Sequence, residues 1–135
     1  MNPPLTIATH IRIARPSLNL ERAQRFYTQG VGLSVLFEHQ SQGSEASLLM
    51  MGVPNAAWHL ELTLHSGSRL EPTPTPDDLL VLYLGQTVSA LTVERLAEHG
   101  GKRVNAFNPY WDQWGVTIAD PDGYRLVLCQ REWMP

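Results

Sequence analysis

Four side chains with useful chemistry alternate with apolar residues in two short segments. The segment HIRIA carries His10 and Arg12, and the segment WHLELTLH carries His59 and Glu61. Because successive side chains of a strand point to opposite faces, each pair shares one face, and the isoleucines and leucines between them share the other. A face with imidazole, guanidinium and carboxylate groups suits hydrogen-bonded ligand recognition, proton transfer or partial metal ligation.

Glu61 is the strongest candidate of the four. A carboxylate flanked by leucines is costly to remove from water without a partner. We therefore expect Glu61 to pair with Arg12, a histidine or a ligand. The polar face is either an ordinary wet sheet face or the lining of a cavity, and both interpretations stay open. The predicted substrate-binding residues are His10, Arg12, His59, Glu61, Tyr83, Tyr110 and Trp114, the last three by stacking.

Composition limits the classes of protein that the chain can belong to. Its 135 residues suit one domain, and the net charge of −3 with no cluster of Lys or Arg argues against a nucleic-acid groove. No apolar run approaches the ~18 residues of a membrane span, and the first residues do not resemble a secretory signal. The single cysteine, Cys129, excludes an internal disulfide and is expected to be a buried, inert thiol. A cytoplasmic protein is the expectation.

Two halves of the chain follow the same order of elements. Residues 7–65 and residues 79–130 each predict a strand, a helix and three further strands, joined by a proline-rich linker at 66–78. The alternative is one α+β sheet with two helices and no true repeat. The strands expected after the helices cover 33–38, 47–51, 58–65, 102–104, 115–119 and 124–130.

The ends of both helices carry recognisable signals. Asn19 is expected to cap the first helix and Gly30 to end it in the left-handed conformation. Thr87 or Ser89 is expected to cap the second helix, which Gly100 and Gly101 end. The segment 108–112 is expected to be a loop. Asp120-Pro121-Asp122-Gly123, between two β-rich runs, predicts a tight turn.

Several of these motifs together resemble the vicinal oxygen chelate superfamily. They are the duplicated layout, His10 followed by LERAQRFYTQGVGL, the strand ending HLELT, and DPDGYRLVL. The superfamily holds glyoxalase I, bleomycin resistance proteins, fosfomycin-modifying enzymes and extradiol dioxygenases. The resemblance covers roughly residues 7–130. It implies an α+β fold in which two βαβββ modules form a cupped, eight-stranded mixed sheet, usually completed as a homodimer.

The same resemblance implies an incomplete metal site. The four ligand positions of metal-dependent members fall on His10, Glu61, the region of Leu79, and Val127. Leucine and valine have no lone pair for a cation, and a catalytic divalent ion normally needs at least three protein ligands. We therefore expect no metal and no other cofactor, although His59 lies close enough in sequence to substitute for one missing ligand.

Three functions remain open from the sequence. The first is a protein that binds a small organic molecule without a complete metal site, as bleomycin resistance proteins do. The second is a lyase or isomerase resembling glyoxalase I, or a dioxygenase-related enzyme, in which Glu61 is the catalytic residue, as metal ligand and base. The third is a non-catalytic partner subunit whose cavity is filled by its own side chains.

Overall fold

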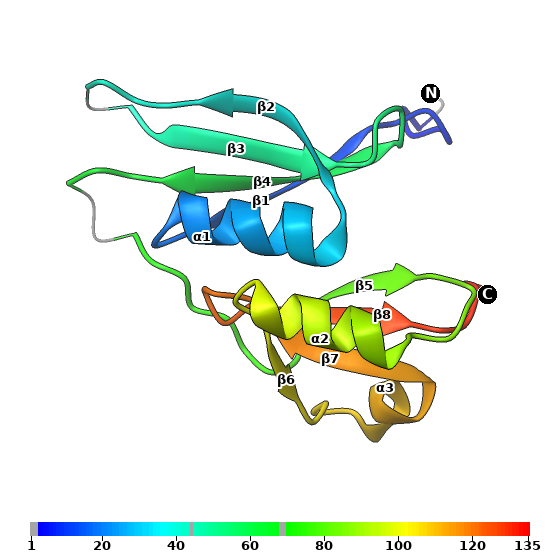
Figure 1. The fold of residues 1–135 in the computed structure, drawn as a ribbon. Coiled ribbons are helices and arrows are strands. Elements are labelled where there is room, and N and C mark those ends of the chain that lie inside the picture. The colour runs from blue at the N-terminus through cyan, green and yellow to red at the C-terminus, as the bar shows by residue number, and fades with distance from the viewer. Residues whose placement is uncertain (1–2, 44, 68–69) are drawn as a thin grey trace.

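The strands form two four-stranded sheets, one in each half of the chain (Figure 1). The computed structural model describes residues 3–43, 45–67 and 70–135. The first sheet has the order β1-β4-β3-β2, and the second has the order β5-β8-β7-β6. The strands are β1 (Ile11–Pro16), β2 (Ser34–His39), β3 (Ser47–Gly52), β4 (Trp58–Leu64), β5 (Leu79–Tyr83), β6 (Lys102–Val104), β7 (Gly115–Ala119) and β8 (Arg125–Cys129).

Both halves have the same topology, which confirms the predicted fold class of two βαβββ modules. In each module the first strand pairs in parallel with the last, and the remaining pairs are antiparallel. Within one chain, the described strands lie in two separate sheets rather than in one continuous eight-stranded sheet. Strands β1 and β5 are therefore both at sheet edges.

The helices begin where their capping residues predict. In α1 (Leu20–Arg25) the Asn19 side chain accepts a hydrogen bond from the backbone N–H of Arg22 at 2.9 Å. In α2 (Ala90–Glu98) the cap is Ser89, which accepts from the N–H of Thr92 at 3.2 Å. Among the described helices, none is long and apolar enough to cross a membrane.

Two local predictions are wrong. The first helix continues from α1 into a π-helix, η1 (Phe26–Val31), so Gly30 lies inside it, and Gly32 is the left-handed residue with φ 101°. The widened π-turn carries the helix past Gly30, whose carbonyl accepts from Arg95 Nε at 3.0 Å. The expected loop at 108–112 is instead part of a short helix, α3 (Pro109–Trp114). Proline at the first helical position after a capping asparagine favours a helix start there.

The face of β4 that carries Leu60 and Leu62 packs toward the helices, as predicted. Leu60 and Leu62 are fully buried in one core cluster with Phe26 and Leu126, so both modules contribute to the same core. Helix α1 lies under the first sheet, on the side that faces the second half of the chain (Figure 1). The opposite face of the first sheet, which carries Glu61, is thus its outer face.

A buried hydrogen-bond network joins the two modules at the predicted turn. Tyr27 in η1 donates its hydroxyl proton to Asp120 Oδ2 at 2.5 Å, and Asp120 Oδ1 accepts from the N–H groups of Asp122 and Tyr124 at 2.8 and 3.0 Å. Ser17 donates to Asp122 Oδ2 at 2.6 Å. Burial raises the pKa of Asp120 and is also the main cause of the raised pKa of Tyr27.

Removing the Tyr27 hydroxyl should therefore destabilise the whole domain. In Tyr27→Phe, Asp120 Oδ2 loses its hydrogen-bond donor in a buried site, which should lower the free energy of unfolding by about 1–3 kcal/mol. Urea denaturation at neutral pH measures the change. Tyr110→Phe is the matched control, because Tyr110 is exposed and its loss should cost less than about 0.5 kcal/mol. Equal stability of Tyr27→Phe and the wild type would show that the network does not hold the modules together.

Candidate functional site

Four of the predicted site residues meet on the outer face of the first sheet. Parallel pairing of β1 with β4 places Arg12 beside His59 and Ala14 beside Glu61. Arg12 Nε donates to His59 Nε2 at 3.0 Å, and His59 Nδ1 lies 2.5 Å from His10 Nε2. Arg12 Nη1 lies 3.8 Å from Glu61 Oε2. We call these four residues the outer-face cluster.

The hydrogen bonds determine which tautomer of each histidine fits the cluster. His59 Nε2 accepts from Arg12, so in neutral His59 the ring proton is on Nδ1. That proton is donated to His10 Nε2, which must supply its lone pair. Each imidazole therefore already uses its single available lone pair within the cluster.

Burial and neighbouring charges keep His59 neutral. His59 is 8% exposed and Glu61 is 7% exposed, whereas Arg12 is exposed. Burial, followed by the electrostatic effects of the neighbouring His10 imidazole and Arg12 guanidinium, lowers the pKa of His59 below its usual 6.5, and the Glu61 carboxylate opposes this shift only partly. Among the described residues, the Glu61 carboxylate accepts no hydrogen bond, and Arg12 is its charged neighbour.

An apolar surface adjoins the outer-face cluster, and the pattern of the sequence does not predict it. A register shift between Val35 and Phe37 is a β-bulge, which puts Phe37 opposite Met50 on the outer face. Met50 in turn pairs with Glu61, and its sulfur lies 3.9 Å from Arg12 Nη2. Phe37 is 52% exposed. No glycine or proline marks this bulge, so simple alternation along β2 would place Phe37 on the wrong face.

The three predicted stacking residues lie in the second module, apart from the outer-face cluster. Tyr83 is at the end of β5, and Tyr110 and Trp114 are in α3; both elements belong to the second half of the chain, below the sheet that contains β1 and β4 (Figure 1). Tyr83 contacts Trp111 edge to face, and Arg131 stacks on Trp114 at 4.4 Å. One chain by itself therefore does not bring the two groups of site residues together.

Helix α3 covers the face of the second sheet that corresponds to the outer face of the first. Leu126 and Leu128 point to the common core, so Val127 and Cys129 point to the opposite face. Both are nevertheless fully buried, and α3 contacts β7 and β8 there. Cys129 is a free, buried thiol, as its sequence context predicts. In the second module this face is closed.

The donor set does not fit a metal ion. The described residues contain no group of three His, Cys, Asp or Glu side chains placed to hold one. The lone pairs of His10 and His59 are used by hydrogen bonds inside the outer-face cluster. The corresponding positions of the second module are Leu79 and the buried Val127, which have no donor atoms.

The arrangement predicts how Arg12 controls His59. In Arg12→Gln, one positive charge beside His59 disappears, so the pKa of its imidazole should rise toward 6.5. An NMR titration of the imidazole resonances measures this shift. In the wild type the folded-state pKa is below 6.5, so protonation favours the unfolded chain, and stability falls as the pH drops through 6.5 toward the folded-state pKa. This dependence should be weaker in Arg12→Gln.

Arg22→Gln is the matched control for that titration, because Arg22 is an exposed arginine of α1, outside the outer-face cluster. It should leave the His59 pKa unchanged. A His59 pKa that stays the same or falls in Arg12→Gln would contradict the arrangement.

Comparison with known proteins identifies relatives along nearly the whole chain. The YycE-like N-terminal domain model matches residues 11–63, and the YycE-like C-terminal domain model matches residues 77–130. The YycE protein of Bacillus subtilis (strain 168), described as uncharacterised, is 42% identical over 122 residues, which cover 90% of this chain and 87% of that protein.

Solved structures give the same picture of the fold. The crystal structure of Bacillus subtilis YycE superposes with a TM-score of 0.80 at 39% identity, covering 94% of this chain and 93% of that one. Trypanothione-dependent glyoxalase I of Leishmania major gives a TM-score of 0.69 at 19% identity, covering 89% and 84%. TnmS3, an antibiotic binding protein from Streptomyces sp. CB03234, gives 0.62 at 20% identity, covering 97% and 100%.

The last two likenesses establish the fold alone, because their identity is low. The relation to YycE is closer and extends through both modules. The chain therefore belongs to the YycE-like family and has the glyoxalase fold of the vicinal oxygen chelate superfamily, which its sequence motifs resemble.

Proposed function

We propose that this protein binds a small organic molecule over the outer-face cluster, without a complete metal site. The observation that carries the proposal is Glu61, a carboxylate that is only 7% exposed on the outer face of the first sheet. Its charged neighbour, Arg12, is 3.8 Å away, which is too far for a hydrogen bond. A nearly buried carboxylate with unused acceptor capacity favours a ligand that donates to it.

The surroundings of Glu61 indicate the kind of ligand. The carboxylate suits a cation or a hydrogen-bond donor, whereas Phe37 and Met50 offer an adjacent apolar surface. Exposed aromatic and thioether side chains bind flat or irregular apolar groups well. A small molecule with a donor group next to an apolar body matches both features.

A second copy of the chain would complete the site. Strand β1 is an edge strand with Ile11 56% exposed, and β5 is the edge strand of the other module. Unpaired, apolar edges favour strand addition. In a homodimer where β1 meets β5 of the other copy, Tyr83, Tyr110 and Trp114 of the partner subunit would approach the outer-face cluster. The eight-stranded cup would then be built between chains.

The fold relatives agree with a binding function, since TnmS3 is described as an antibiotic binding protein. For this chain, the free cysteine, Cys129, suits the reducing cytoplasm. A non-catalytic partner subunit is the second candidate, because α3 already covers the face of the second sheet that carries Val127. The two functions differ in whether any ligand stabilises the protein.

A thermal-melt screen of amines, guanidines and amides with aromatic bodies tests the proposal. A ligand present at 100 times its Kd should add about 2.7 kcal/mol to the stability of the folded protein. In Glu61→Gln, the affinity for such a ligand should fall by about 1–3 kcal/mol, measured by calorimetry, because a charged acceptor becomes neutral. Zn²⁺, Ni²⁺ and Mn²⁺ should leave the melting temperature unchanged.

Glu94→Gln is the matched control, since Glu94 is an exposed carboxylate of α2. Equal affinity in Glu61→Gln and the wild type would refute the role of Glu61. A protein that no compound stabilises would favour the partner-subunit function, and an ion-selective rise in melting temperature would favour the enzyme hypothesis.

The dimer has its own test. Ile11→Asp puts a charge on the exposed β1 edge, so sedimentation should show monomers where the wild type shows dimers, while circular dichroism stays the same. Leu91→Asp is the control, because Leu91 is 74% exposed on α2, away from both sheet edges. A monomeric wild type would contradict the completed site directly.

A further inference from the structure

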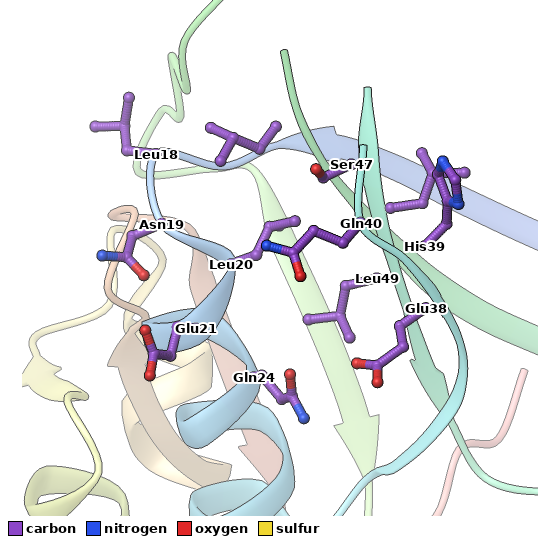
Figure 2. A pocket seen from close by; sticks show the side chains of 12 residues that line it. Leu18, Asn19, Leu20, Glu21, Gln24, Glu38, His39, Gln40, Ser47 and Leu49 are labelled. Atoms are coloured by element: carbon purple, nitrogen blue, oxygen red, sulfur yellow. The ribbon is translucent and has the colours of Figure 1, made fainter. Parts of the chain in front are cut away.

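A cavity lies on the opposite face of the first sheet from the outer-face cluster. It has a volume of about 700 Å³ and opens between the start of α1 and strands β2 and β3 (Figure 2). This volume is within the range of sites that hold small organic ligands. The cavity is lined by residues of β2, β3 and the end of β4, and none of the four side chains of the outer-face cluster is among them.

The floor of the cavity is apolar. Leu49 is 2% exposed and belongs to the hydrophobic core, and Leu20 packs against that core from α1. Leu64 and Leu18 also line the cavity and are 36% and 63% exposed. Exposed leucines around a buried one give the cavity a surface that an apolar body would remove from water.

Polar side chains that are not engaged elsewhere point into the same space. Figure 2 shows Gln24 of α1 and Glu38 and Gln40 of the β2 side directed toward the gap above Leu49. In the part of the chain that the structure describes, the side chains of Gln24, Glu38 and Gln40 make no hydrogen bond and no ion pair. Their hydrogen-bonding capacity is therefore available to a ligand.

The β-bulge in β2 is what directs Glu38 into the cavity. Val35 pairs with Met51 on the helix-facing side, so regular alternation would send Glu38 to the outer face. After the bulge, Glu38 instead pairs with Leu49, the buried floor residue. Bulges often re-aim a side chain beside a binding site.

The charge of the lining is one-sided. Glu21 and Glu38 are its carboxylates, and among the described residues that line it there is no Lys or Arg. Its histidine, His39, lies 3.7 Å from Glu45, outside the cavity. Within the described residues, neither Glu21 nor Glu38 has a cationic partner within ion-pair distance. Two unpaired carboxylates beside an apolar floor favour a positively charged ligand.

We propose that this cavity is a second binding site, for a small organic cation with an apolar body, in which Glu38 holds the positive group above Leu49. The site is independent of the outer-face cluster and of the dimer. Its ligand enters between α1 and β2, with the amides of Gln24 and Gln40 as hydrogen-bond partners.

Three probes of similar shape but different charge test the proposal. Benzylamine, benzyl alcohol and phenylacetate are titrated into the ¹⁵N-labelled protein, and backbone amide shifts report where each one binds. Benzylamine should shift amides along α1, β2 and β3 and should bind more tightly than benzyl alcohol, with phenylacetate weakest. Glu38→Gln should weaken benzylamine binding about 1.5- to fivefold, as expected for one exposed carboxylate, and leave benzyl alcohol unchanged.

Two further variants make the result decisive. Glu94→Gln should leave all three affinities unchanged, because Glu94 is an exposed carboxylate outside the cavity. Gln24→Trp should fill the gap and abolish the amide shifts that benzylamine and benzyl alcohol cause along α1 and β2, whether or not benzylamine also shifts amides around Glu61. The proposal is overturned if the three probes bind equally, if no probe shifts these amides, or if benzylamine shifts the amides around His59 and Glu61 instead.

Discussion

The buried carboxylate of Asp120 is the interaction on which the assembly of the two modules depends. An unpaired carboxylate in this position would be strongly unfavourable, and three hydrogen bonds offset its desolvation. One of the three comes from Tyr27 of the other module. The Asp120 carboxylate therefore has all its hydrogen-bond donors only when η1 packs against the turn. The π-helix and the DPDG turn are thus structural partners, and the core closes around them.

With that junction closed, the first sheet has two faces of different character. Its inner face is covered by α1, with a cavity between the start of that helix and strands β2 and β3, and its outer face has no helix of the same module over it. Polar residues on the outer face are close enough to build the outer-face cluster, in which Arg12, His59 and His10 form one directed chain of hydrogen bonds. The bulge in β2 then places Phe37 on the outer face and Glu38 on the inner face.

The departure from the metal-dependent members of the superfamily has a physical basis beyond the missing ligands. The histidine lone pairs that a metal ion would need already accept hydrogen bonds within the cluster. The second module has no compensating donors, because α3 covers Val127 and Cys129. Binding chemistry built on Glu61 is consistent with these features, whereas Lewis-acid chemistry would require the cluster to rearrange.

The sequence by itself determined the features that depend on neighbouring residues. The strand pattern put Leu60 and Glu61 on opposite faces, Asn19 and Ser89 capped their helices, and the DPDG turn formed as predicted. The tertiary structure decided the rest. The bulge that re-aims Glu38, the contact between Tyr27 and Asp120, and the separation of Tyr83 from His10 all depend on pairing between segments distant in the chain. Local periodicity carries no information about such pairing, because its energy arises only when the segments meet.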